Sequence, residues 1–132
     1  MIAVVKMVIV MRSDLGLRKG EIAAQVAHAA MKWLCERIKA WRHEDWSSGS
    51  GTEASVMTPE EDEWVLGTFT KIVLRVDSAE ELAAIGSKAI EAGLTVRTVE
   101  ESNLGGKVTC IGIGPHEAEK IDPITGHLRP YS

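Results

Sequence analysis

Residues 2–10 constrain the fold most strongly, because they form an almost unbroken apolar run rich in Val and Ile. Such a run is typical of a central strand that is covered on both faces. Turn-forming residues follow at 12–17, and apolar residues then recur at three- and four-residue steps over 19–42. That periodicity predicts a long helix with an apolar face. A buried strand followed by an amphipathic helix is the opening of an α/β fold.

The same apolar run does not indicate a membrane protein. It contains Lys6 and is far shorter than the stretch of about 20 residues that crosses a bilayer. It also lacks the basic start and the cleavage site of an export signal. The sequence therefore predicts a cytoplasmic protein with no membrane contact.

The remaining pattern completes one domain of residues 1–132. Further strands are predicted at 70–76, 94–99 and 107–113, and further helices at 58–66, 77–93 and 116–121. We expect Gly114 and Pro115 to stop the last strand, and Trp33 and Trp41 to lie in the core. The element order predicts an α/β domain with a four-stranded mixed sheet and helices on both faces. Residues 43–57, which contain a Ser- and Gly-rich run, are interpreted as a flexible insertion.

The distribution of charge does not exclude a polyanionic ligand. The whole chain has a formal charge of -4, but residues 1–42 hold eight Lys and Arg against three Asp and Glu. The first third is therefore basic and the rest acidic. Local potential depends on this distribution more than on the net value. The alternative is that these bases only decorate a solvated helix.

Generic cofactor and metal motifs are absent from the sequence. The four histidines have no ligand spacing, and the two cysteines lie far apart, so we expect no metal, no cofactor and no disulfide framework. Residues 112–115, Gly-Ile-Gly-Pro, lack the spacing of a dinucleotide fingerprint. A small-molecule site at these residues is the weakest of the functional hypotheses.

The basic loop and the start of the long helix contain the residues most suited to chemistry. A helix start offers unpaired N–H groups and a positive dipole end, which favour an anion such as phosphate. Lys19 lies there and is suited to contact a phosphate or to polarise a carbonyl oxygen; its alternative is an ordinary solvated lysine. Gln25, His28 and Lys32 share one helix face. Gln25 and His28 are suited to hold a water molecule or a nucleic-acid backbone, or else form a buried pair under the loop.

Two separated motifs resemble one known family. Residues 6–29 contain Lys-Met-Val-Ile-Val, Asp-Leu-Gly, Lys-Gly, Ala-Ala-Gln and His-Ala in order, and residues 109–128 contain Thr-Cys-Ile-Gly-Ile-Gly-Pro and Ile-Asp-Pro-Ile-Thr-Gly-His-Leu. Both resemble the archaeal- and eukaryotic-type (type two) peptidyl-tRNA hydrolases. The resemblance covers most of the chain except residues 43–57.

The resemblance implies a fold, a reaction and a set of residues. It implies a usually dimeric α/β fold that hydrolyses the ester between a peptide and the 3′ ribose of tRNA, without metal or organic cofactor. The family's functional lysine falls on Lys19, and its helix-face residues fall on Gln25 and His28. The threonine before the Gly-Ile-Gly-Pro segment falls on Thr109. The expected partners are therefore tRNA and a second copy of the chain.

The chain departs from this family in one loop. The family carries Asp-Ala-Gly-x-Thr between its last two strands, whereas this chain is shorter there and aligns Glu101 with the aspartate. Glu101, or Asp14 in the basic loop, is expected to orient Lys19 or a water molecule. Thr109 is expected to hydrogen-bond the water or the substrate, or to be a simple strand residue. The residues expected to follow the tRNA backbone, in a salt-dependent manner, are Arg12, Arg18 and Lys32.

Two readings of the function follow from this departure. The first is a peptidyl-tRNA hydrolase that uses Lys19, Glu101, Thr109 and His28. The second is a catalytically impaired relative that acts as an RNA-binding or protein-interaction module. Release of free tRNA by the native chain distinguishes the two.

Overall fold

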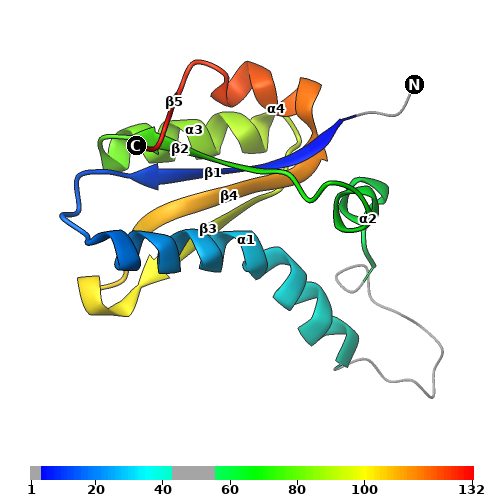
Figure 1. Ribbon diagram of the computed structural model, residues 1–132, viewed down its shortest axis with the longest axis horizontal. Coiled ribbons are helices and arrows are strands. Elements are labelled where there is room, and N and C mark those ends of the chain that lie inside the picture. Colours follow the sequence, from blue (N-terminus) through cyan, green and yellow to red (C-terminus); the bar gives the residue numbers. More distant parts are fainter. Residues whose placement is uncertain (1–3, 43–55) are drawn as a thin grey trace.

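A mixed sheet runs through the middle of the molecule, and helices cover both of its faces (Figure 1). The computed structural model describes residues 4–42 and 56–132. The elements in chain order are β1 Val5–Arg12, α1 Lys19–Arg42, α2 Pro59–Leu66, β2 Lys71–Val76, α3 Ala79–Glu91, β3 Val96–Glu101, the 3₁₀ helix η2 Ser102–Leu104, β4 Lys107–Glu117, α4 Ala118–Thr125 and β5 Arg129–Pro130.

The sheet order is β3-β4-β1-β2-β5, so the first strand lies at the centre, as its apolar run predicted. β1 pairs with β2 in parallel and with β4 antiparallel, and β3 and β4 form an antiparallel hairpin. The predicted four strands are one too few. The fifth, Arg129–Pro130, pairs with β2 at the edge of the sheet. A two-residue strand that contains proline has neither the length nor the alternation that identifies a strand in a sequence.

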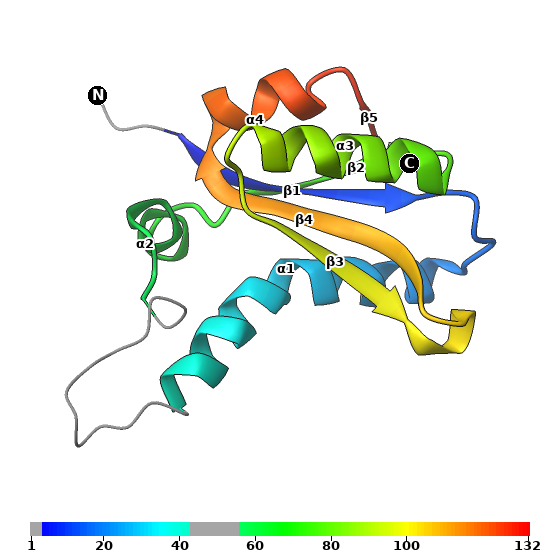
Figure 2. The same ribbon diagram turned by 180° about the vertical axis from the view of Figure 1, so that it is seen from behind.

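Alternating residues of β1 point into two separate cores. Val8 and Val10 pack with α3 and α4, whereas Ile9 and Met11 pack with α1. Turning the molecule by 180° shows the same separation, with α3 and α4 on one side of the sheet and α1 on the other (Figure 2). The prediction of helices on both faces is confirmed, and β1 is buried because both of its faces are covered.

β4 runs further than predicted. Gly114 and Pro115 do not stop it; the strand continues to Glu117 and resumes pairing with β1 at Lys6 and Val5. The register shifts between Lys6 and Val8, so the extra residues are absorbed in an irregularity rather than ending the strand. Gly114 has φ +94, a conformation that glycine adopts without strain. The last helix accordingly starts later than predicted, at Ala118.

Close packing explains why a second residue of β4, Gly112, is a glycine. A Cβ atom at Gly112 would lie 3.0 Å from the carbonyl oxygen of Ala29 in α1 and 3.4 Å from Met7 Cε. Gly112 therefore lets the helix approach β4 closely. Both glycines have structural roles, and nothing in this geometry supports the hypothesis of a small-molecule site at residues 112–115.

α2 closes one end of the α1 core. A capping box starts this helix: Thr58 Oγ1 accepts from Glu61 N at 3.1 Å, and the Glu61 side chain accepts from Thr58 N at 2.8 Å. Glu61 is buried and forms an ion pair with Arg37 of α1 at 3.1 Å, a contact that the sequence pattern did not reveal. Trp33 is fully buried as predicted, but the prediction for Trp41 is wrong, because 50% of its surface is exposed near the end of α1.

The predicted insertion at 43–57 falls mostly outside the described residues. Of its last two residues, Val56 is exposed, and Met57 packs against the core cluster that contains Trp33 and Trp64. No helix within residues 4–42 and 56–132 combines the length and apolar character needed to cross a bilayer.

Candidate active site

A short chain of hydrogen bonds links α1 to the β3–β4 hairpin. Thr109 Oγ1 donates to Gln25 Oε1 at 2.6 Å, and Gln25 Nε2 donates to Glu101 Oε2 at 2.7 Å. Thr109 is fully buried and Gln25 is 4% exposed. An amide that accepts from a hydroxyl and donates to a carboxylate has its oxygen and nitrogen positions fixed. We call these three residues the relay.

A backbone irregularity turns Thr109 towards α1. In the β3–β4 register, Val99 faces Cys110 and Glu100 faces Val108, so Thr109 is an extra residue without a partner. Simple alternation would place Thr109 on the same side as Ile111, which packs into the α3 core. A bulge re-aims a side chain in this way. The irregularity is therefore the local cause of the Thr109–Gln25 contact.

Glu101 is the solvent-accessible end of the relay. It is the last residue of β3, and its Oε1 accepts from Asn103 N at 3.1 Å while its Oε2 accepts from Gln25. The Asn103 N–H, the Gln25 amide and, less strongly, the charge of His28 lower the pKa of Glu101. Hydrogen bonds to the charged form of a carboxylate have this effect. Glu101 is thus held as a carboxylate by groups that point at its two oxygens.

His28 and Lys32 lie further along the same side of α1 as Gln25. Both line a cavity of about 330 Å³ next to β3, together with Val99 and Glu100. His28 is exposed, whereas Lys32 donates from Nζ to the carbonyl oxygen of Thr98 at 2.6 Å. Lys32 therefore ties α1 to β3 in addition to any contact with a ligand.

The start of α1 presents exposed cations. Glu21 accepts from the backbone N–H of Arg18 at 3.1 Å, which satisfies one of the unpaired donors at the helix start. Lys19 and Arg18 are exposed, and neither side chain forms an ion pair with another residue in the described part of the chain. Both views place this helix start at the same end of the molecule as the turn that joins β3 to β4 (Figures 1 and 2).

The predicted contact between Lys19 and Glu101 is not an ion pair in this structure. Glu101 instead receives its hydrogen bonds from Gln25 and Asn103. The two groups nevertheless belong to elements that meet at this end of the sheet (Figure 1). The solvent-facing side of Glu101 remains accessible to a ligand, because the residue is only partly buried.

Arg12 and Asp14 form a pair of their own. Arg12 donates to both oxygens of Asp14, at 2.9 Å from Nε and 2.8 Å from Nη2, and to the carbonyl oxygen of Val108 at 3.1 Å. The Arg12 guanidinium lowers the pKa of Asp14. Arg12 lies against the α3 side of the sheet, where it lines a cavity with Leu82. The predicted substrate-binding residues are therefore divided between the two faces.

Cys110 does not supply a reactive thiol, and the described residues hold no cluster suited to a metal ion. Cys110 is buried beneath α1, burial raises its pKa to about 11, and its thiol donates to the carbonyl oxygen of Gln25 at 3.4 Å. A thiol that remains protonated is a poor nucleophile. No three His, Cys, Asp or Glu side chains within 4–42 and 56–132 converge as a metal site would require.

The chain is thus a small α/β protein with a mixed sheet. At one end of that sheet, a buried amide joins a threonine hydroxyl to an accessible carboxylate. The chain matches the model of the family described as "Peptidyl-tRNA hydrolase PTH2" over residues 5–131. It belongs to that family.

Similar proteins extend over nearly the whole chain. A peptidyl-tRNA hydrolase of Sulfurisphaera tokodaii is 38% identical over 128 residues, which cover 94% of this chain and 96% of that protein. One of Sulfolobus acidocaldarius is 34% identical over 128 residues, covering 94% and 98%. A solved structure of a protein of unknown function from Agrobacterium tumefaciens C58 has a TM-score of 0.59 at 15% identity, covering 97% and 98%. This last similarity concerns the fold alone.

Proposed function

We propose that the chain hydrolyses the ester between a peptide, or an N-blocked aminoacyl group, and the 3′ ribose of tRNA, releasing free tRNA. Membership of the PTH2 family supports the reaction. The single observation that supports this end of the sheet as its site is the relay, in which Thr109 and Gln25 hold Glu101. Ester hydrolysis needs a positioned water, a group that takes its proton, and positive charge near the developing oxyanion.

The relay, His28 and Lys19 each supply one of these requirements, and the exposure of each side chain indicates which. Glu101 is the accessible carboxylate and orients the attacking water. His28, exposed beside it, is the side-chain type most often used to accept a proton. Thr109 is buried and its hydroxyl is engaged by Gln25, so it acts as a positioning residue through Gln25 rather than by touching the substrate. Lys19 supplies the positive charge at the helix start, where the dipole adds to it.

The tRNA backbone is bound by the cations around this site. Arg18 and Lys19 are exposed at the start of α1, while Arg12 and Lys32 keep donors beyond those used in their structural contacts. Asp14 holds Arg12 in place. Because the substrate is an intermediate of translation, we place the protein in the cytoplasm.

We propose further that the protein is a homodimer. α1 exposes an apolar strip of small and aliphatic residues beside a cavity of about 650 Å³, and the opposite wall is Trp64, Phe69 and Val73. Met31 on the strip is 58% exposed and Phe69 is 50% exposed. Contiguous apolar surface of this kind marks interaction sites. Sedimentation equilibrium of the native chain and of Met31→Glu tests this: a dimer that dissociates in the variant is expected, and a native monomer at all concentrations contradicts it.

A charge-removal experiment tests the hydrolase assignment. We expect the native chain to release tRNA from N-acetyl-aminoacyl-tRNA, and Lys19→Ala to lower kcat/KM by about tenfold or more, because it removes a charge that acts on the substrate. Lys39→Ala, which changes an exposed lysine near the other end of α1, is the matched control and keeps native turnover. Binding of the substrate without turnover by the native chain would favour the RNA-binding alternative instead.

A further inference from the structure

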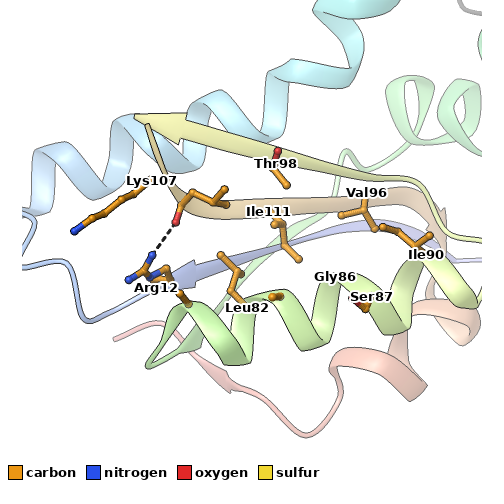
Figure 3. Close-up of a pocket in the computed structure, with 12 residues that line it drawn as sticks. Arg12, Leu82, Gly86, Ser87, Ile90, Val96, Thr98, Lys107 and Ile111 are labelled. Atoms are coloured by element: carbon orange, nitrogen blue, oxygen red, sulfur yellow. Dashed lines mark hydrogen bonds between the residues drawn. The ribbon is translucent and has the colours of Figure 1, made fainter. Parts of the chain in front are cut away.

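The far side of the sheet carries a cavity that the proposed reaction does not use. It has a volume of about 400 Å³ and lies between α3 and the strands β3 and β4 (Figure 3). The relay lies on the α1 side, so the sheet separates the two. A volume of a few hundred Å³ is within the range of small-molecule sites.

The lining of this cavity is aliphatic with a basic end. Its walls are aliphatic side chains from α3 and from the hairpin, without an aromatic ring. Arg12 and Lys107 lie together at one end, and Ile90 and Val96 lie towards the other (Figure 3). The residues that line it are Arg12, Ala79, Leu82, Ala83, Gly86, Ser87, Ile90, Val96, Thr98, Lys107, Val108 and Ile111. No acidic side chain is among them.

The two cations differ in how far they are engaged. Arg12 donates to Asp14 and to the carbonyl oxygen of Val108, which fixes its guanidinium at the mouth of the cavity. Lys107 is exposed and forms no ion pair with any residue in the described ranges. Asp14 already pairs with the Arg12 guanidinium, so the unpaired positive charge that attracts an anion to this end is that of Lys107.

We propose that this cavity binds an unbranched aliphatic carboxylate, with the head group at Lys107 and Arg12 and the chain along α3 towards Ile90. The absence of aromatic rings disfavours nucleobases and other flat ligands, which bind by stacking. Each buried methylene adds to affinity through the hydrophobic effect. The site shares Arg12 with the proposed tRNA-binding cations but shares no residue with the relay.

Calorimetric titration of the full chain with decanoate tests the proposal. We expect saturable binding with one site per chain, and binding of decanol and of decyltrimethylammonium weaker by about tenfold or more, because neither has an anionic head group. Equal binding of decanol and decanoate, or no saturable binding of decanoate, would overturn it.

Two substitutions locate the ligand. Gly86→Leu fills the floor of the cavity: a Cβ there meets only Ile111 Cδ1, at 3.6 Å, and leucine is a better helix former than glycine. Lys107→Glu reverses the basic end on the surface, where it does not disturb the core. Both are expected to lower decanoate affinity by about tenfold or more, whereas Lys120→Glu on α4 keeps native affinity. Native affinity in both variants contradicts the proposal.

The same variants separate this site from other uses of the groove. Turnover of N-acetyl-aminoacyl-tRNA is expected to be unchanged in Gly86→Leu, since that residue lies on α3 and outside the proposed machinery. If Lys107→Glu and Gly86→Leu instead dissociate a dimer, the groove is a subunit interface and the carboxylate proposal is wrong.

Discussion

Thr109 shows how one residue's role depends on a detail of the backbone that its sequence neighbours conceal. Its type and its place before the Gly-Ile-Gly-Pro segment identified it as a candidate, but strand alternation would turn it away from α1. The bulge opposite Val99 reverses that direction. Residue types and the family resemblance identified Gln25, Glu101 and Thr109 as candidate site residues, but neither predicted that the three are joined by hydrogen bonds.

Removing the Thr109 hydroxyl tests the relay without changing side-chain shape. In Thr109→Val, the buried Gln25 Oε1 loses its donor, and an unsatisfied buried acceptor costs about 1–3 kcal/mol of folding free energy. We expect that loss in urea unfolding, together with a lower kcat at unchanged KM. Thr109→Ser retains the hydroxyl and restores most of both. Native stability and native kcat in Thr109→Val would show that the hydroxyl contributes nothing.

The lowered pKa of Glu101 predicts how stability depends on pH. The hydrogen bonds from Asn103 and Gln25 favour the carboxylate in the folded state, so their contribution is full above the unfolded pKa and is lost as pH falls through the lower, folded pKa. The stability difference between the native chain and Glu101→Gln should thus be constant near neutral pH and shrink in acid. Unfolding midpoints measured from about pH 7 to about pH 3 check this. A difference that grows in acid has the wrong sign for this account.

At the scale of elements, close packing of α1 on β4 is what brings Gln25 to Thr109. The periodicity of residues 19–42 predicted the helix, and the β-branched runs predicted four strands. Neither pattern predicted the irregularity at Gly114 and Pro115, because the extra residues are accommodated by pairing with β1, which is far away in sequence. The edge strand β5 was not predicted, because a segment of two residues is too short to show the alternation of apolar and polar residues that identifies a strand.

A bulkier residue at Gly112 tests the importance of that approach. The Cβ of Gly112→Val would lie 3.0 Å from the Ala29 carbonyl oxygen, so α1 must move away from β4. Overpacking of this kind costs about 1–3 kcal/mol, and the shift should also lower kcat by separating Gln25 from Thr109. Gly20→Ala, in the first turn of the same helix with nothing within 4 Å of the added Cβ, is the control and should lower neither the stability nor kcat, because alanine is a better helix former than glycine. Equal unfolding curves for Gly112→Val and the native chain would refute the packing argument.

For the whole molecule, the sheet separates the relay from the aliphatic cavity. The α1 side carries the relay and the exposed cations of the helix start, and the α3 side carries the aliphatic cavity with its basic end. The excess of cations lies in residues 1–42 of the sequence, and two of them, Arg18 and Lys19, are exposed at the start of α1. The division of Arg12 and Lys32 between opposite sides of the sheet could not be predicted, because it depends on how β1 and α1 are placed in three dimensions.

The most direct test of the central claim is single-turnover hydrolysis of N-acetyl-aminoacyl-tRNA by the native chain, Glu101→Gln and Glu100→Gln. The substitution at Glu101 removes the charge that faces solvent at the end of the relay. Its exposed neighbour Glu100 takes no part in the hydrogen bonds of the relay. We predict native turnover in Glu100→Gln and a rate lower by about a hundredfold in Glu101→Gln, as expected for a misplaced or missing catalytic group. Equal rates in Glu101→Gln and the native chain would contradict the account.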